Sequence, residues 1–299
     1  MLGHHRAGRH RATGTRSWLL VLTYLTVAAA GVAALVTAVY TAADPPPRVA
    51  MRPPARSVPT PPAPRTVALH TGPVYVDSAG FLSWALLDRR SGRISGSANR
   101  TAPSDTMSMV KSWIAADYLR RAAERGVTPS RQRMRELTIM IRDSDNGSAQ
   151  TIFAELGRRA SIERLIAICG LTDSHPYRTW WSNTTVSARD VVRIGACLAD
   201  GRAAGPRWTR WLLDEMRQVR GAGDFGVRTA LPDRLAARVA IKNGWLLRSG
   251  DGLWHISCLA IGEDWVLGVL ARYPGALGFG YGTQLCQDVG AQLISPLSP

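Results

Sequence analysis

The chain has 299 residues, is 45% hydrophobic and carries a formal net charge of +15. This size and composition favour one globular domain with appended segments. Eight arginines and one aspartate give residues 1–66 a charge of +7, which leaves +8 for the rest. Because no stripe of interleaved basic and aromatic residues occurs, we expect no nucleic-acid partner. The charge of +8 on the rest of the chain has two explanations. It could attract the protein to an anionic wall or lipid surface, or it could be an ordinary solvated surface.

The N-terminal part of the chain predicts a membrane anchor. Residues 1–16 form a basic tail, and residues 17–43 are uncharged and mostly apolar. A helix of about 20 such residues spans a bilayer, whereas a cleaved signal peptide has a core of about 7–15 residues. We favour an uncleaved anchor with the tail in the cytoplasm. A cleaved signal, which would leave a secreted protein, is the alternative, because residues 41–43 (Thr-Ala-Ala) form an acceptable cleavage site. No cysteine lies nearby, so a bacterial lipid anchor is not expected.

The rest of the chain predicts a linker and one α+β domain. Residues 44–70 are rich in proline and should form an extended linker, followed by a domain over residues 71–299. Alternating polarity and turn residues predict strands near both ends of this domain, and helical spacing of apolar residues predicts a helical lobe between them. The expected strands cover residues 74–77, 81–88, 93–99, 237–246, 253–262 and 265–273, and the expected helices cover residues 108–124, 130–142, 147–158, 161–169, 187–199, 208–217 and 282–294.

Four cysteines show no metal-binding spacing, and no His, Cys, Asp or Glu cluster suggests a metal or cofactor. On the expected topology all four lie outside the cytoplasm, where disulfides persist. Of the three pairings that four cysteines allow, we expect Cys169–Cys197 and Cys258–Cys286. Buried free thiols are the alternative.

Lysine is nearly absent, and its two occurrences point to a catalytic centre. Lysines and arginines total 37, but only Lys111 and Lys242 are lysines. A guanidinium cannot lose its proton at any working pH, so a position that needs a base excludes arginine. Lys111 follows Ser108 by one helical turn, where it could accept the hydroxyl proton of that serine. A capping serine and a lysine whose stem lies along the surface explain the same pair structurally.

Two further motifs carry polar groups that suit acyl transfer. Ser144-Asp145-Asn146 lies in a loop between two helices, where it could relay a proton and bind an amide or simply cap the second helix. Lys242-Asn243-Gly244 lies on a strand, where side chains alternate between faces. Lys242 and Gly244 should share one face and Asn243 the other. A glycine within a strand often marks close approach of a ligand or another backbone. A surface lysine on a bulged strand is the alternative.

The order of SxxK, SDN and KNG along the chain is more specific than any one motif. With these motifs, the sequence resembles penicillin-recognising serine hydrolases, especially class A β-lactamases and related D,D-peptidases. Residues 183–190, Asn-Thr-Thr-Val-Ser-Ala-Arg-Asp, also resemble a Thr-Thr-containing helix start of that family. The resemblance implies an antiparallel five-stranded sheet with flanking helices and an inserted all-helical lobe.

The resemblance also implies roles for individual residues. Ser108 would attack a carbonyl and become acylated, with Lys111 as base and Ser144 as relay. Lys242 would help to protonate the leaving group. The backbone N–H groups of Ser108 and Trp245 would form the oxyanion hole.

The substrate side of the site would be formed by Asn146, Asn243, Gly244 and Trp245. Here the sequence departs from the family, because Asn243 stands where Thr or Ser is usual. Residues 170–183 also lack the glutamate that activates the hydrolytic water in class A β-lactamases. Acylation is therefore expected to outpace deacylation.

A few other residues could serve the site but fit structural roles equally well or better. His175 and His255 fit a surface and a packing role, and Arg228 and Arg248 are candidate carboxylate clamps or ordinary surface arginines. Trp180 and Trp181 could rim a groove or anchor the core. The sequence thus predicts a membrane-anchored serine hydrolase acting on β-lactams or D-Ala-D-Ala-like peptidoglycan peptides, a D,D-peptidase rather than an efficient β-lactamase. An esterase or amidase on the same scaffold is a second enzymatic option. A catalytically silent wall-binding or signalling module on the same fold is the non-enzymatic alternative.

Overall fold

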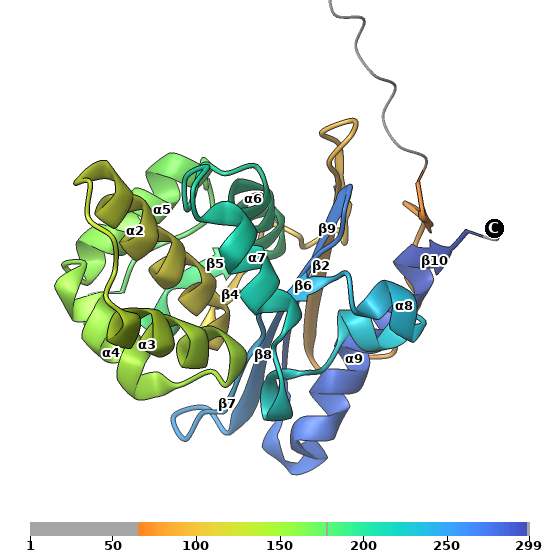
Figure 1. Cartoon of the computed structure of the whole chain (residues 1–299). Coiled ribbons are helices and arrows are strands. Elements are labelled where there is room, and N and C mark those ends of the chain that lie inside the picture. Colours follow the sequence, from red (N-terminus) through yellow and green to blue (C-terminus); the bar gives the residue numbers. More distant parts are fainter. Residues whose placement is uncertain (1–64, 178, 298–299) are drawn as a thin grey trace, which may run out of the picture. The chain divides into compact units, whose positions relative to one another are not determined.

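The computed structural model describes residues 65–177 and 179–297 (Figure 1). The expected basic tail at residues 1–16, the anchor at 17–43 and most of the 44–70 linker lie outside these residues. Among the helices that the structure describes, none combines the length and apolar character that crossing a membrane requires. The hydrophobic core runs from Val67 to Ile294, so the described unit carries the core that it needs to fold by itself.

The central sheet is antiparallel, with the order β3-β2-β9-β8-β6, and β7 also pairs with β8. β6 and β7 act as one interrupted strand, because Ile241 pairs with Ala260 and Gly244 with Ser257 in one continuous register. Counted in this way the sheet has the five strands that were predicted. Its members are β2 (Phe81–Asp88), β3 (Ile94–Gly96), β6 (Ala240–Ile241), β7 (Gly244–Leu247), β8 (Leu253–Ile261) and β9 (Trp265–Pro274).

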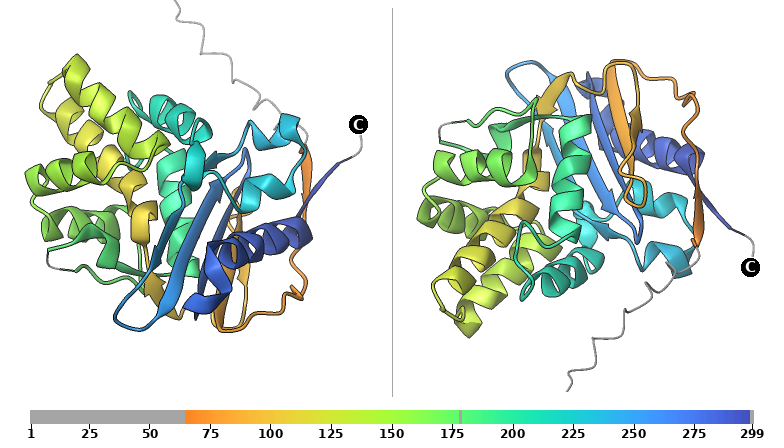
Figure 2. Two further views of the ribbon diagram at one scale, coloured as in Figure 1. Left: turned by 90° about the horizontal axis from the view of Figure 1, so that it is seen from below. Right: turned by 90° about the horizontal axis from the view of Figure 1, so that it is seen from above.

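Helices cover both faces of this sheet. The helical lobe packs through α6 on one face, and α9 covers the other, as Figures 1 and 2 show. In the lobe, α2 lies at the centre, with Trp113 and Ile114 fully buried. The helices are α2 (Lys111–Glu124), α3 (Arg131–Arg142), α4 (Asn146–Glu155), α5 (Arg159–Cys169), α6 (Ala188–Ala199), α7 (Thr209–Arg217), α8 (Asp233–Ala236) and α9 (Gly278–Leu293). The predicted α+β class with an inserted helical lobe is confirmed.

Two small sheets, which the sequence did not predict, complete the fold. β1 (Val67–Leu69) pairs with β10 (Ile294–Pro296), and β4 (Pro103–Asp105) pairs with β5 (Thr185–Ser187). β1 falls within the expected linker, so the folded unit begins before residue 71. Its partner is too distant in sequence for local pattern to reveal the pairing.

The strand predicted at residues 74–77 is wrong, because that segment is irregular and Tyr75 is exposed. The backbone N–H and carbonyl of Tyr75 bond the side-chain amide of Gln292 instead of a neighbouring strand.

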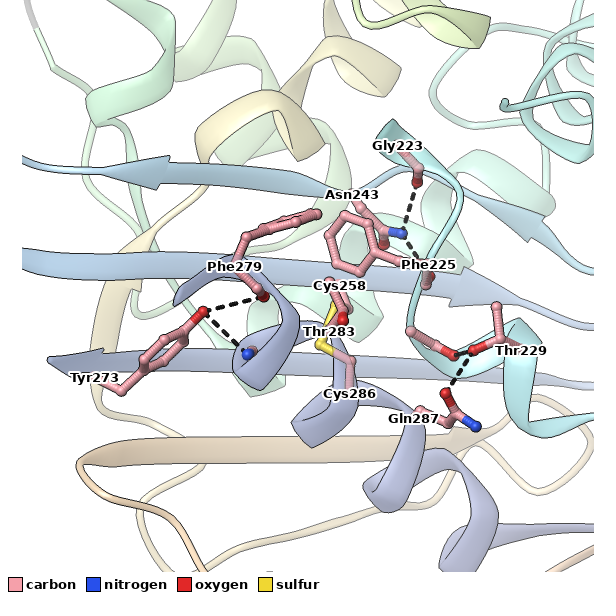
Figure 3. The surroundings of a disulfide bond; sticks show 12 residues. Gly223, Phe225, Thr229, Asn243, Cys258, Tyr273, Phe279, Thr283, Cys286 and Gln287 are labelled. Atoms are coloured by element: carbon pink, nitrogen blue, oxygen red, sulfur yellow. Dashed lines mark hydrogen bonds between the residues drawn. A yellow bond between two sulfur atoms is a disulfide. The ribbon is translucent and has the colours of Figure 1, made fainter. Parts of the chain in front are cut away.

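Both predicted disulfides are present. Cys169–Cys197 joins α5 to α6, and Cys258–Cys286 joins β8 to α9 (Figure 3). The second bond lies against Gly226, where a side chain would come within 2.9 Å of the Cys286 Cβ. Gly226 has φ 82°, a conformation that glycine adopts without strain. The disulfide thus packs directly against the loop that precedes β6.

Candidate functional site

Two lysine amines converge on one serine hydroxyl between the helical lobe and the sheet. The Nζ of Lys111, at the start of α2, lies 3.3 Å from the Oγ of Ser144. The Nζ of Lys242, between β6 and β7, lies 3.0 Å from the same oxygen. Lys111 also donates to the Ser144 carbonyl at 2.5 Å and to Asn146 Oδ1 at 2.7 Å. Three segments that are far apart in sequence thus form one polar cluster.

The loop between α3 and α4 is shaped to present this cluster. Ser144 has φ 60°, which is uncommon for a residue other than glycine and indicates a tightly constrained turn. Asp145 then caps α4 by accepting a hydrogen bond of 2.6 Å from the Ser148 N–H. The capping role considered for this motif therefore belongs to Asp145. It leaves the side chains of Ser144 and Asn146 directed at Lys111.

Burial governs the electrostatics of the two amines. Both side chains are fully buried, and among the described residues neither forms an ion pair with a carboxylate. Burial lowers the pKa of Lys111 to about 7, while the charge of nearby Asp145 acts in the opposite direction. Burial, and then the charge of Lys111, hold the pKa of Lys242 well below its usual range. Near neutral pH the cluster can therefore hold and release a proton.

Ser108 precedes Lys111 by three residues, on a short 3-10 helix that spans Met107–Val110 and leads into α2. The sequence predicted an α-helix from Ser108 itself. Met107 has φ 47°, and the tight turn there delays the start of α2 until Lys111. Residues three apart lie on nearly the same side in both 3-10 and α-helical geometry, so we expect the side chains of Ser108 and Lys111 to face the same way across this junction. Ser108 itself is half-buried.

Gly244 explains how the sheet approaches Ser108 so closely. A Cβ at this position would lie 2.5 Å from the Ser108 nitrogen and 2.5 Å from the Met107 Cβ. No side chain fits in that space, so glycine is required here. β7 can therefore lie directly against the backbone of the candidate nucleophile.

Asn243 and Trp245 point to the opposite face of the sheet, as the alternation predicted. The amide of Asn243 donates to the carbonyls of Gly223 at 3.1 Å and Phe225 at 2.8 Å (Figure 3). The Trp245 ring packs on Phe225 and Phe279. The structure does not bring these two side chains to the lysine cluster. Asn243, which stands where the resemblance implies Thr or Ser, therefore anchors the loop that contains Gly223 and Phe225.

The acidic groups near residues 170–183 are already engaged. Asp173 accepts hydrogen bonds from Arg189 and from the Ser187 hydroxyl. Asp190 accepts from backbone N–H groups and from Arg193. Neither carboxylate is free to act on a water molecule at the cluster.

The candidate carboxylate clamps are also engaged elsewhere. Arg228 is buried and donates to Asp224 and to the carbonyl of Val219, so its role is structural. Arg248 lies 2.9 Å from Asp105 and donates to Asn183.

The histidines and tryptophans take different positions. His175 is exposed, as expected for a surface residue, and His255 is buried between the carboxylates of Asp105 and Asp251. Trp180 is exposed, whereas Trp181 is buried with its ring against Lys111. From the sequence, Trp181 could be predicted only to rim a groove or to anchor the core. Local sequence does not show which helix a tryptophan in a loop will contact. No local pattern in the sequence pointed to Asp105, which contacts both Arg248 and His255.

Comparison with solved structures defines the class of fold. The TLA-3 extended-spectrum β-lactamase matches with a TM-score of 0.63 at 13% identity, over 72% of this chain and 92% of that protein. A class A β-lactamase from Mycobacterium abscessus matches with a TM-score of 0.56 at 16% identity, over the same shares of the two chains. The chain therefore has the fold of class A β-lactamases, as the motifs led us to expect.

A sequence relative is found among mycobacterial proteins. A protein named "Putative lipoprotein LppW", from Mycobacterium tuberculosis and Mycobacterium bovis, is 33% identical over 189 residues. The match covers 61% of this chain and 60% of LppW, which is less than two thirds of that protein's length. No family model matches the chain.

Proposed function

We propose that this protein is a serine hydrolase that forms an acyl-enzyme on Ser108. The Ser108 oxygen attacks the substrate carbonyl while its proton passes to the neutral amine of Lys111. The bond from the carbonyl to the leaving nitrogen then breaks, and Ser144 and Lys242 deliver a proton to that nitrogen. Asn146 binds the substrate amide, and the N–H groups of Ser108 and Trp245 stabilise the oxyanion. Loss of one such donor typically costs about 10²–10³ in rate.

The observation that carries this proposal is the pair of buried amines on one hydroxyl. Charged lysines are almost never fully buried without a partner, because desolvating an ammonium is costly. Here both lysines are buried on the hydroxyl of Ser144, so the fold incurs this cost twice at one site. Packing alone does not explain two buried amines at one hydroxyl, whereas a role in proton transfer does.

The substrate that we propose is a β-lactam or a D-Ala-D-Ala-like peptidoglycan peptide. We propose a D,D-peptidase or penicillin-binding protein rather than an efficient β-lactamase. The carboxylates of Asp173 and Asp190 are held by arginines and backbone groups, which leaves neither to activate the hydrolytic water. An acyl-enzyme formed here should therefore be long-lived.

We place the enzyme outside the cytoplasm, anchored by residues 17–43. Two disulfides support this location, because such bonds persist in oxidising compartments. The word lipoprotein in the name of the mycobacterial relative is consistent with a cell-envelope location.

A fluorescent penicillin tests the proposal. We expect covalent labelling of the protein and no labelling of the Ser108→Ala variant. Ser112→Ala is the matched control, because this buried hydroxyl bonds only the Met109 carbonyl and should leave labelling intact. A chromogenic cephalosporin then separates the enzyme classes. One stoichiometric burst indicates a penicillin-binding protein, and steady turnover indicates a β-lactamase.

A catalytically silent wall-binding or signalling module is the second candidate. It is favoured by two observations: the buried ring of Trp181 covers the Lys111 amine, and Arg248, a candidate carboxylate clamp, is already paired with Asp105. Reversible binding of a wall peptide without any covalent adduct would support this candidate over the first.

A further inference from the structure

Trp181 is the one aromatic side chain within cation–π distance of either lysine in the described part of the chain. Its ring centre lies 4.6 Å from the Nζ of Lys111, and the residue is only 3% exposed. It comes from residues 170–183, a segment that contributes no carboxylate to the cluster. The contact therefore joins this segment directly to the candidate base.

The backbone of Trp181 is bonded to the segment that leads to Ser108. The Trp181 carbonyl accepts hydrogen bonds from the Thr106 hydroxyl at 3.4 Å and from the Thr184 N–H at 3.2 Å. The indole N–H itself has no partner among the described residues. Since Thr106 precedes the 3-10 helix of Ser108, the same stretch of chain holds the nucleophile and the tryptophan.

The ring acts on the amine in two opposite ways. An aromatic face attracts an ammonium group, which favours the protonated form. The same ring keeps water from the amine, which favours the neutral form. Other groups facing Lys111 are the amine of Lys242, the carboxylate of Asp145 and the neutral side chains of Ser144 and Asn146. The amine is fully buried and the ring that covers it is itself only 3% exposed, so we expect water exclusion to be the larger effect of the ring.

We propose that Trp181 is the positioning residue of the base: its ring holds the Lys111 amine against Ser144 and shields it from water. This inference rests on the proposed function, in which Lys111 accepts the Ser108 proton. The ring takes no part in bond making. It fixes where the amine lies and how readily the amine gives up its proton.

The scarcity of lysine makes a direct test feasible. Protein labelled with ¹³C and ¹⁵N only in lysine shows two side-chain signals, and the Lys242→Arg variant identifies the signal of Lys111. We expect Trp181→Ala to raise the midpoint of the Lys111 titration by about one pH unit, because water then reaches the amine. Trp181→Phe, which keeps a ring in place, should move it much less. An unchanged or lowered midpoint in Trp181→Ala would overturn the proposal.

Trp208 offers a matched control. It too has a cation over its ring, Arg207 at 5.0 Å, and an unpaired buried indole N–H, but it lies at the start of α7. Trp208→Ala should leave the Lys111 midpoint unchanged, and a shift there equal to that of Trp181→Ala would count against a specific role.

The acylation rate provides the second readout. Its pH dependence should move in parallel with the Lys111 midpoint in Trp181→Ala. If the unmodified protein does not react with penicillin, the proposed function fails, while the titration still decides the role of Trp181.

Discussion

Replacing Lys111 by arginine distinguishes two possible roles of Lys111, a positive charge and a proton acceptor. The substitution preserves the positive charge, but a guanidinium cannot accept the Ser108 proton. Burial lowers the pKa of Lys111 from 10.5 to about 7, so about half of the protein carries a neutral amine at pH 7. A lysine with an ordinary pKa would be neutral in only about one molecule in 3,000 at that pH. The fold thus supplies a usable base.

The expected loss follows from the usual contribution of a general base. General bases typically contribute about 10²–10⁴ in rate, so Lys111→Arg should slow acylation by that factor at pH 7. The unmodified enzyme should acylate faster as the pH rises through about 7, because the reactive form is the deprotonated one. The assay is the rate of fluorescent penicillin labelling between about pH 5.5 and pH 9. A rate that does not change over this range, or a variant within tenfold of the unmodified enzyme, would refute Lys111 as the base.

Three further substitutions test the geometry around this base. Lys111→Met should abolish acylation yet raise the free energy of unfolding at pH 7 by about 2–4 kcal/mol, because it removes a buried amine that has no carboxylate partner and must lose its proton on folding. Denaturant melts check this. The gain should fade toward pH 10, where the unfolded lysine also loses its proton. Gly244→Ala should destabilise the protein by about 1–3 kcal/mol and slow acylation, because the alanine Cβ would lie 2.5 Å from the Ser108 nitrogen. A variant that reacts with fluorescent penicillin at the rate of the unmodified protein would contradict this packing. Asn243→Ala should cost about 1–3 kcal/mol, because the carbonyls of Gly223 and Phe225 lose their buried donor; an unchanged melting temperature would show that the loop is held by other contacts.

The sequence predicted the fold because its signals were local and mutually consistent. The capping serines at 130 and 187 mark the starts of α3 and α6, and the turn around Gly92 marks the β2–β3 hairpin. The lone lysines pointed to the cluster because arginine replaces lysine everywhere else in the chain. Alternation along the strand also placed Lys242 and Asn243 on opposite faces.

Other features depend on contacts between distant segments. β1 is too short to carry a pattern of its own, and its partner β10 is more than 200 residues away. The turn before α2 includes Met107, which packs tightly against Gly244 from a distant segment, a contact that no local propensity encodes. The contact of Trp181 with Lys111 likewise requires the path of a long loop.

Peptide mapping of the protein after incubation with penicillin tests the central claim most directly. We predict one covalent adduct, located on Ser108, in the protein with both disulfides formed. We also predict no adduct in the Ser108→Ala variant. A correctly folded protein that gains no mass, or that carries the adduct on another residue, would contradict the acyl-enzyme mechanism.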